Sequence, residues 1–435
     1  NHLDTILAGL LDRRRSRNQL RSLTTVPPGA ADFSSNAYLS LSTHPAVQAA
    51  FLARLQHEAS TSSPQSLLGS GGSRLLDGNS PYAERLERAV AAFHRASAGL
   101  FFNSAMDANV GLFSCVPQPG DAIVYDELIH ASVHDGMRLS RVVPAKRIPF
   151  AHNLVWNTGS EAKPSSTDSN PGTKSRNLKS LETVLQDLQT GAEGHLFRSG
   201  KKNVFIAVEG VYSMDGDIAP LADVVRCIAR SLPRGNGYLV VDEAHSAGIF
   251  GARGEGLVCA LGLENHVWAR VLGFGKAMSC AGGIVLCSSD TTRSYLVNYA
   301  RSLIYTTAMA FPSLAGIEVA YDFLASGRAE PLLAHLRGII RQTHGLLLAV
   351  CARQTPPRHL LRVDAAAPKS PIIPIFTSQP RGLARHCQRS GFMVRPIVAP
   401  TVPRGGERVR VCLHAGNTMS EIEGLVAAVE AWVVA

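Results

Sequence analysis

The chain contains cysteines but no pair of them at the short spacing that metal and redox sites use. Its eight cysteines are scattered along 435 residues without a CxxC pair, at positions 115, 227, 259, 280, 287, 351, 387 and 412. The pattern argues against a structural zinc site and provides no disulfide framework. We therefore expect a soluble protein of a reducing, cytoplasmic compartment. The chain begins at Asn1 rather than at methionine, so no particular organelle is indicated.

Long apolar runs and nucleic-acid motifs are also lacking. No apolar stretch reaches the roughly 18 residues of a membrane span, so no membrane partner is predicted. The net charge is +9, and part of the basic excess comes from short clusters such as residues 13–15. Without a binding motif this charge argues only weakly for nucleic acid, and no nucleic-acid partner is predicted. An anionic substrate such as an acyl-CoA would suit the charge equally well, and so would a merely solvated basic surface.

The glycine-rich stretches do not complete a nucleotide-binding motif. A P-loop requires glycine five residues before the glycine of its Gly-Lys pair, and Ser or Thr after the lysine. Around Lys276 these positions hold Arg270 and Ala277. Residues 67–74 (LLGSGGSR) do not form a full GxGxxG and follow a polar sequence. We expect them to form a flexible loop near a phosphate or the substrate.

Two histidines lie at a spacing that zinc sites use on a helix. His130 and His134 are four residues apart, but HExxH is absent and no third ligand is evident. No metal site is predicted. We favour one histidine stacking on a flat cofactor, with an ordinary core or surface histidine as the alternative.

What the sequence does contain is a lysine and a carboxylate at the ends of two predicted strands. Residues 238–242 (YLVVD) form an apolar run that ends in Asp242, and Lys276 follows about thirty residues later between small residues. In open α/β sheets ligands bind at the carboxyl ends of the strands. A buried lysine has a lowered pKa and can act as a nucleophile. A lysine that forms a Schiff base, with an acid to hold a pyridinium nitrogen, is the minimum apparatus of a pyridoxal phosphate enzyme.

Strands and helices alternate through most of the chain, which predicts an α/β fold with a mostly parallel central sheet flanked by helices. Apolar periodicity predicts helices over about 1–25, 45–58, 81–93, 178–189, 221–231, 313–352 and 419–433. We divide the chain into an N-terminal helical arm (1–45), a large cofactor-binding α/β domain (46–299) and a small C-terminal α+β domain (300–435). Residues 154–177 are polar and are interpreted as a surface insertion within the large domain.

Seven sequence motifs, in order, resemble those of the α-oxoamine synthases, pyridoxal phosphate enzymes of fold type I. They are FSSNAYLSL, GSGGSRLLDGN, DELIHASVHDG, EGVYSMDGDIAPL, VVDEAHSAGIFG, FGKAM and PTVPRGGERVRV. The resemblance covers roughly residues 20 to 430. It implies an N-terminal arm, a large cofactor-binding domain, a small C-terminal domain and a homodimer with shared active sites.

The resemblance also implies roles for individual residues at the cofactor. Lys276 would hold the cofactor in a Schiff base and later move the Cα proton, Asp242 would pair with the pyridinium nitrogen, and His130 would stack on the ring. These three form the predicted catalytic set. The other predicted cofactor contacts are His245 and Ser213 near the ring hydroxyl, the backbone of Ala105 and Met106 at the phosphate, and Thr306 or Thr307 at the phosphate of the partner subunit.

For the substrate, the resemblance implies that Arg410 holds the amino acid carboxylate by a bidentate pair. Arg21, Asn36 and Thr401 match substrate-contacting positions of the 8-amino-7-oxononanoate synthases. The implied reaction is a decarboxylating condensation of a small amino acid with an acyl thioester to give an α-aminoketone. L-alanine and pimeloyl-CoA are the expected substrates, as in biotin biosynthesis.

Two other interpretations stay open at this stage. A related synthase of secondary metabolism would use a polyketide-type thioester, and a non-catalytic partner subunit of a heterodimer would have lost the catalytic lysine. The chain departs from the family at Gly273, where threonine usually helps to bind the phosphate, and at Ser279, where glycine is common. Loss of one hydrogen bond to a charged group costs roughly 1.5–3 kcal/mol unless another group, such as Ser279, replaces it.

Overall fold

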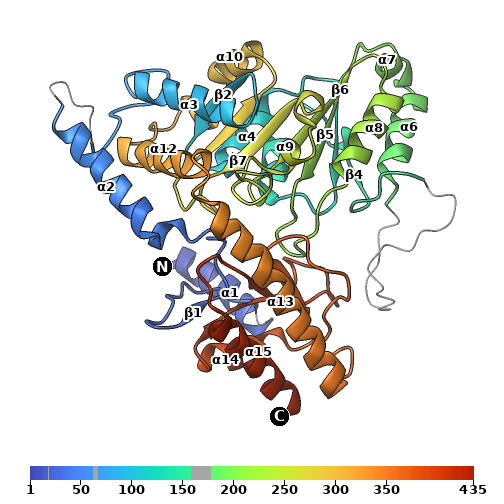
Figure 1. Ribbon diagram of the computed structural model, residues 1–435. Coiled ribbons are helices and arrows are strands. Elements are labelled where there is room, and N and C mark those ends of the chain that lie inside the picture. The colour runs from blue at the N-terminus through green and yellow to red at the C-terminus, as the bar shows by residue number, and fades with distance from the viewer. Residues whose placement is uncertain (18, 62–66, 158–177) are drawn as a thin grey trace.

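A seven-stranded sheet forms the centre of the larger part of the molecule (Figure 1). The computed structural model describes residues 1–17, 19–61, 67–157 and 178–435. In spatial order the strands are β2 (Ala98–Phe102), β8 (Gly283–Cys287), β7 (Ala269–Gly273), β6 (Gly237–Asp242), β5 (Val204–Glu209), β3 (Ala122–Asp126) and β4 (Arg147–Phe150). Strands β7, β6, β5, β3 and β4 pair in parallel, and β8 is antiparallel to both of its neighbours. The prediction of a mostly parallel α/β sheet is confirmed.

Helices cover both faces of this sheet because its strands are apolar on both sides. In β5, Phe205 and Ala207 pack on one face, whereas Ile206 and Val208 pack on the other. Strands buried on two faces are typical of parallel sheets. The helices of this part are α3 (Pro81–Phe93), α4 (Ala105–Cys115), α5 (Ala131–Leu139), α6 (Leu181–Thr190), α7 (Gly194–Arg198), α8 (Leu221–Ser231), α9 (Leu257–Ala260), α10 (Asp290–Tyr299) and α11 (Arg301–Ile304), with short 3₁₀ turns η2 (Pro144–Lys146) and η3 (Glu264–His266).

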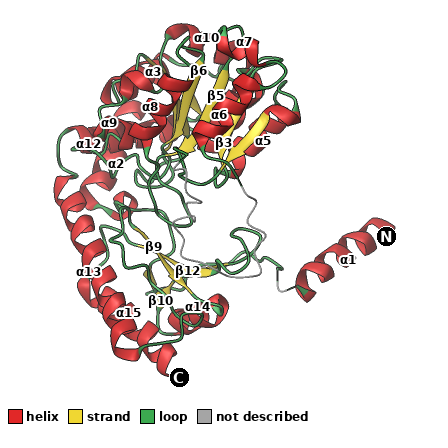
Figure 2. Ribbon diagram, turned by 90° about the vertical axis from the view of Figure 1, so that its right-hand side faces the viewer, coloured by secondary structure: helices red, strands yellow, loops and turns green. Residues whose placement is uncertain are grey.

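A second, antiparallel sheet lies below the first one in Figure 2 and is built from late segments of the chain. Its order is β11 (Arg395–Ile397), β12 (Arg408–Cys412) and β9 (Ile372–Phe376). Beside it, β1 (Ala31–Asp32) pairs in parallel with β10 (Phe392–Met393). The N-terminal segment is therefore bound to the C-terminal part of the chain. The remaining helices are α1 (His2–Ser16), α2 (Pro45–Ala59), α12 (Phe311–Ala325), α13 (Glu330–Gln354), α14 (Pro380–Arg389) and α15 (Met419–Val434), with the 3₁₀ turn η1 (Leu41–Thr43).

Two predicted helices have different bounds in the structure. The helix expected over 1–25 ends at Ser16, well before the prolines at 27 and 28, and α1 extends away from the rest of the chain with no buried residue (Figure 2). The stretch expected to be helical over 313–352 is two helices, α12 and α13. They are separated at Gly327, whose φ of +79° is a left-handed conformation that ends a helix. Of the predicted insertion, residues 158–177 lie outside the described part of the chain.

In the described ranges no helix is long and apolar enough to cross a membrane. In the same ranges, no three metal-ligating side chains gather at one point, and neither His130 nor His134 belongs to such a group.

Candidate active site

The carboxyl ends of four neighbouring strands bring a lysine and three carboxyl groups to one edge of the sheet. Asp242, Glu209 and Asp126 are the last residues of β6, β5 and β3, and Lys276 follows the end of β7 by three residues. Glu209 and Asp242 are direct register partners. The predicted lysine and acid therefore emerge from adjacent parallel strands, as the sequence indicated.

Lys276 has an unpaired amine close to several charged groups. Its Nζ makes no hydrogen bond or ion pair with a described residue. Burial lowers the pKa of Lys276 most strongly and nearby Arg410 lowers it further, whereas Asp242 and Glu209 act in the opposite direction. Burial and the neighbouring Asp242 in turn raise the pKa of Glu209 well above its usual range. The net lowering favours a neutral, nucleophilic amine on Lys276.

Asp242 is held by neutral donors. Its Oδ1 accepts from the backbone N–H of Ala244 at 2.9 Å, and its Oδ2 accepts from the side-chain amide of Asn109 at 2.7 Å. Both Asp242 and Asn109 are buried. The two bonds fix the orientation of the carboxylate and leave its remaining lone pairs free for a further donor, such as a protonated ring nitrogen.

A chain of hydrogen bonds runs from Asp242 to His130. Asn109 Nδ2 also donates to Ser132 Oγ at 3.0 Å, and Ser132 Oγ lies 2.7 Å from His130 Nδ1. A carboxylate can only accept, so the Asn109 amide must donate toward Asp242, and the Ser132 hydroxyl that accepts from it donates onward to His130. The Ser132 backbone N–H also donates to Nδ1, which leaves the imidazole proton on Nε2.

The two middle members of this chain of hydrogen bonds, Asn109 and Ser132, were not predicted. The orientation of the Asn109 amide has a cost, because its Oδ1 is buried without a partner among the described residues. His130 itself is solvent-exposed and caps the N-terminus of α5, so its ring has an open face. Asn109 and Ser132 lie three and two residues from the predicted site residues Met106 and His130, and that proximity was the available signal.

His245 lies beside the N-terminal segment of the chain. Burial, with Lys276 and Arg410 nearby, lowers the pKa of His245 well below its usual range, so the ring is neutral. Tyr38 Oη lies 2.8 Å from His245 Nδ1 and donates to Asn36 Oδ1 at 3.2 Å. The structure thus brings Asn36 into the site through Tyr38, a buried residue that the sequence analysis did not single out.

Arg410 carries a buried charge without an acidic partner. It lies on β12, and its Nη1 and Nη2 donate to the backbone carbonyls of Ser213 (3.0 Å) and Ser34 (3.4 Å). It forms no ion pair with a described carboxylate, and its buried Nε has no partner there. A buried guanidinium with an unused donor is suited to bind a carboxylate from a ligand.

The N-terminus of α4 is the candidate phosphate site. Ser104 caps the helix by accepting from the Asp107 N–H at 3.0 Å, and the N–H groups of Ala105 and Met106 have no acceptor in the described chain. Free N–H groups at a helix N-terminus bind phosphate. A Cβ added at Gly273 would lie 3.1 Å from the Ala105 Cβ, so the strand end presses close to this helix.

Of four further predicted residues, two lie beside α4 and two do not contact the cluster in the described chain. Thr306 and Thr307 flank α4, because Asn103 Nδ2 donates to Thr306 Oγ1 (3.3 Å) and to the Thr307 carbonyl (2.9 Å). Arg21 and Thr401 are solvent-exposed, and their side chains make no hydrogen bond or ion pair with the cluster in the described chain. The structure of this single chain therefore does not bring Arg21 and Thr401 into the site.

The arrangement fits pyridoxal phosphate. An unpaired lysine amine, a carboxylate with free lone pairs, an exposed imidazole and the free N–H groups of α4 match its aldehyde, ring nitrogen, ring face and phosphate. The family threonine that would add a phosphate contact is absent at Gly273. Ser279 Oγ is buried without a partner in the described chain, and Ser279 has a left-handed φ of +54°.

Comparison with known proteins identifies the family. The model of the aminotransferase class I and II family matches residues 29–429. An 8-amino-7-oxononanoate synthase of Emericella nidulans is 49% identical over 428 residues, which cover 97% of this chain and 94% of that protein. The aminoacyl transferase sphA of Aspergillus fumigatus is 37% identical, with 96% of this chain and 84% of that protein covered.

Solved structures show the same fold at lower identity. The serine palmitoyltransferase of Sphingomonas wittichii has a TM-score of 0.76 at 22% identity, with 99% of this chain and 97% of that chain covered. The 8-amino-7-oxononanoate synthase of Francisella tularensis has a TM-score of 0.64 at 22% identity, with 92% and 97% covered. This chain therefore belongs to the aminotransferase class I and II family and, within it, to the α-oxoamine synthases, pyridoxal phosphate-dependent acyltransferases of fold type I.

Proposed function

We propose that the protein catalyses the decarboxylating condensation of L-alanine with pimeloyl-CoA to give 8-amino-7-oxononanoate, a step of biotin biosynthesis. The observation that carries the amino acid half is Arg410, a buried guanidinium without an acidic partner in the described chain, close enough to Lys276 to lower its pKa. The relative with 49% identity supports the choice of substrates, because its name is that of this synthase.

In this proposal each residue has a distinct task. Pyridoxal phosphate, when bound, supplies an electron sink for the pair left behind when the amino acid loses its Cα proton. Arg410 holds the carboxylate of the amino acid, and the Lys276 amine, once free, removes that proton as a general base. Asp242 keeps the ring nitrogen protonated, and the Nε2–H tautomer of His130 lies against the ring.

The remaining predicted contacts complete the same arrangement. His245 and the Ser213 hydroxyl contact the ring hydroxyl, and the free N–H groups at the start of α4 hold the phosphate. His245 is neutral, so it donates or accepts a hydrogen bond there without adding a second positive charge beside Lys276. Asn36, Arg21 and Thr401 complete the substrate site in the assembled enzyme.

A different acyl donor is the second candidate. The 37% identical relative named aminoacyl transferase sphA supports the alternative of a synthase of secondary metabolism that uses another, polyketide-type thioester. The acyl chain would contact apolar side chains. Such a pocket distinguishes two acyl chains by only about 1–3 kcal/mol of binding free energy for each methylene group by which they differ, so the two acyl donors are hard to tell apart from the residues alone. A non-catalytic partner subunit is a weaker alternative because Lys276, Asp242, His130 and His245 are all in place.

We also propose that the enzyme is a homodimer whose second copy covers α1. Five apolar residues on this helix are 45% to 60% exposed, namely Leu3, Ile6, Leu7, Leu10 and Leu11. Met106, in the first turn of α4, and Tyr305, at the end of α11, are 50% and 70% exposed. Clustered apolar exposure of this kind marks a protein interface. Thr306 and Thr307 follow Tyr305 in the chain, and in this proposal they reach the phosphate of the second copy.

The absorption spectrum of the purified protein with added pyridoxal phosphate tests the proposal. We expect a yellow band that L-alanine perturbs and that glycine, L-serine and L-threonine do not. Addition of pimeloyl-CoA should then release CO₂ and 8-amino-7-oxononanoate, detected by mass spectrometry. Lys276→Ala is the control that should give no product. A band without product from pimeloyl-CoA, followed by product from a polyketide-type thioester, would select the second candidate, and a colourless protein would select the partner subunit.

A further inference from the structure

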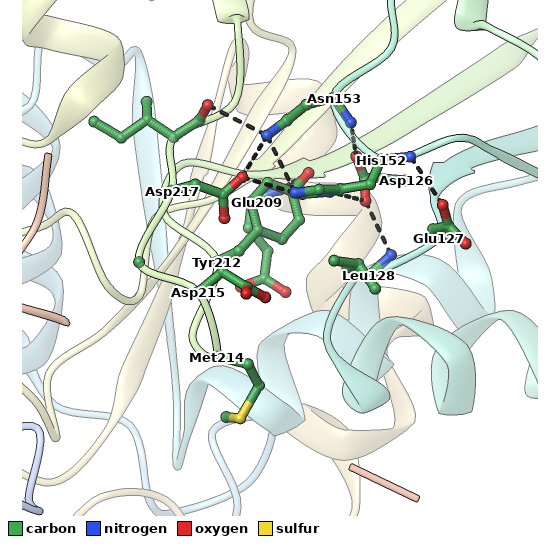
Figure 3. Close-up of polar contacts among 12 residues, drawn as sticks. Asp126, Glu127, Leu128, His152, Asn153, Glu209, Tyr212, Met214, Asp215 and Asp217 are labelled. Atoms are coloured by element: carbon green, nitrogen blue, oxygen red, sulfur yellow. Dashed lines mark hydrogen bonds and ion pairs between the residues drawn. The ribbon is translucent and has the colours of Figure 1, made fainter. Parts of the chain in front are cut away.

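A histidine outside the predicted site lies between two carboxylates at the same edge of the sheet. His152 Nδ1 is 2.8 Å from Asp126 Oδ1, and His152 Nε2 is 2.7 Å from Asp217 Oδ2 (Figure 3). Asp126 ends β3 and is fully buried, whereas Asp217 belongs to the hairpin of residues 211–218 that follows β5. His152 therefore joins the sheet to this hairpin.

The geometry requires both ring nitrogens of His152 to donate. A neutral imidazole has one donor and one acceptor nitrogen, and an acceptor nitrogen facing a carboxylate would be repelled. Only the imidazolium form satisfies both contacts. Burial opposes this form, but the hydrogen bonds to Asp126 and Asp217 outweigh it and raise the pKa of His152 to about 10. The Tyr212 ring packs against the imidazole in a T-shaped arrangement, with the ring centroids 4.5 Å apart.

Neighbouring polar groups complete the cluster. Asn153 donates from its backbone N–H to Asp126 Oδ2 at 2.9 Å and from its side chain to Asp217 Oδ2 at 2.6 Å. Asn153 has a left-handed φ of +56°, which asparagine tolerates better than most residues. Glu209 is the other acid at this edge, and Asp126 contributes to the raised pKa of its carboxyl group.

The hairpin held by His152 reaches the second sheet and the candidate substrate site. The Ser213 carbonyl accepts from Arg410 Nη1 at 3.0 Å, and Arg408 forms an ion pair with Asp215. At Gly216, with a φ of +72°, the carbonyl accepts from Ser370 Oγ at 2.7 Å. A shift of the hairpin would therefore move the acceptor that orients Arg410.

We propose that His152, as an imidazolium between Asp126 and Asp217, is a positioning residue that fixes the 211–218 hairpin and, through the Ser213 carbonyl, the guanidinium that receives the substrate carboxylate. The assignment of that carboxylate rests on the proposed function, whereas the charge and the clamp rest on the contacts of His152 alone. In the described chain His152 itself makes no hydrogen bond with Asp242 or His130, and the proposed effect on the substrate acts through the hairpin and Arg410.

The test compares His152→Gln with the wild type in the full-length protein loaded with pyridoxal phosphate. Glutamine can donate from its single amide nitrogen but carries no charge. We expect the spectroscopic dissociation constant for L-alanine to rise roughly tenfold, because the Ser213 carbonyl would no longer hold Arg410 in place. The KM for the acyl thioester should stay unchanged. An equal loss of affinity for L-alanine and for the acyl thioester, or no loss of affinity for either, would overturn the positioning role.

His94→Gln is the matched control. His94 is also buried, but its Nδ1 lies 2.8 Å from the Glu255 carbonyl and its Nε2 lies 2.7 Å from the Tyr321 hydroxyl, so its partners are neutral. This change should lower the melting temperature and leave the L-alanine dissociation constant at the wild-type value. If it raises that constant as much as His152→Gln does, general loosening explains both and the proposal fails.

A titration of histidine-labelled wild-type protein by ¹⁵N–¹H NMR tests the charge without any turnover. Both nitrogens of His152 should carry protons at pH 8, and Asp217→Asn should move the midpoint of deprotonation to lower pH. A midpoint near pH 6.5, the ordinary value for histidine, would overturn the clamp. If the wild type binds L-alanine but condenses it with no thioester, the proposed function fails while the binding and titration results still decide the role of His152.

Discussion

Asp242 and Asp126 end two strands of the same sheet, on the same edge, and differ in the charge of their partners. Asp242 is held by the Asn109 amide and a backbone N–H, both neutral. Asp126 is held by the His152 imidazolium together with the backbone N–H groups of Leu128 and Asn153, each at 2.9 Å. A carboxylate with neutral partners keeps its negative charge available to a ligand, whereas one paired with a cation is neutralised locally and serves the structure.

Replacement of each acid by asparagine should therefore have opposite consequences. Asp242→Asn should lower kcat by about 10³-fold, in the range found when one preorganised electrostatic contact to a reacting centre is removed. Its melting temperature should stay close to that of the wild type. Steady-state kinetics and thermal unfolding, measured on the same preparations, compare the two variants.

Asp126→Asn should mainly destabilise the fold, by about 3–5 kcal/mol, because it leaves a buried imidazolium with one carboxylate instead of two. Its kcat at a temperature where it is folded should remain within an order of magnitude of the wild type. The distinction between the two acids is wrong if Asp126→Asn loses turnover as Asp242→Asn does while keeping its stability.

The pH dependence of stability should come from the ion pair between Asp126 and His152. The folded-state pKa of His152, about 10, lies above the ordinary histidine value of 6.5. Its contribution is therefore fully present below pH 6.5 and is lost as the pH rises toward 10. Between pH 6.5 and 9 the loss amounts to roughly 3 kcal/mol at most.

Because burial also raises the pKa of several cysteines and tyrosines, the wild type loses stability at alkaline pH for other reasons too. The informative quantity is the difference in unfolding free energy between the wild type and His152→Gln. This difference should shrink from pH 6.5 to pH 9. A constant difference would mean that His152 is neutral in the folded protein.

Asn109→Ala tests whether the neutral partners of Asp242 contribute to catalysis. It removes the donor between Asp242 and Ser132, and a hydrogen bond to a charged group contributes about 1.5–3 kcal/mol, so kcat/KM for the amino acid should fall roughly 10- to 100-fold. Ser132→Ala is the matched variant, because it keeps the bond between Asn109 and Asp242 and removes only the hydroxyl contact with His130, while the backbone N–H of residue 132 still donates to that ring. A loss confined to Ser132→Ala would show that His130, rather than Asp242, needs the chain of hydrogen bonds.

The Asp242 side could be predicted from sequence because its residues lie in continuous segments. An apolar strand that ends in Asp242 and a glycine-flanked Lys276 each form a local pattern, and adjacent parallel strands place them side by side. Strands that are apolar on both faces predicted the sheet for the same reason. The ends of the helices were harder to predict from sequence, as the shortened α1 and the break between α12 and α13 illustrate.

The Asp126 side could not be predicted in this way. Residues 126, 152 and 217 come from three separate segments, and a histidine in a loop carries no spacing signal. Only the fold brings the two carboxylates to opposite nitrogens of one ring. Arg21 and Thr401 illustrate the converse, since they match substrate-contacting positions of the family, yet both are solvent-exposed and make no hydrogen bond with the cluster in the described chain.

Ser279 offers the smallest and most discriminating effect at the Lys276 turn. A left-handed conformation costs a non-glycine residue roughly 1–2 kcal/mol, and a buried hydroxyl without a partner adds to this cost. Ser279→Gly should therefore stabilise the protein without cofactor by about 1 kcal/mol, whereas Ser279→Ala keeps the strained conformation and removes only the hydroxyl. If Ser279 replaces the threonine that is missing at Gly273, both variants should bind pyridoxal phosphate several-fold more weakly in a spectroscopic titration. Unchanged affinity for pyridoxal phosphate in both variants would mean that Ser279 does not bind the phosphate. The free N–H groups at the start of α4 would then be enough to bind it without a threonine at position 273.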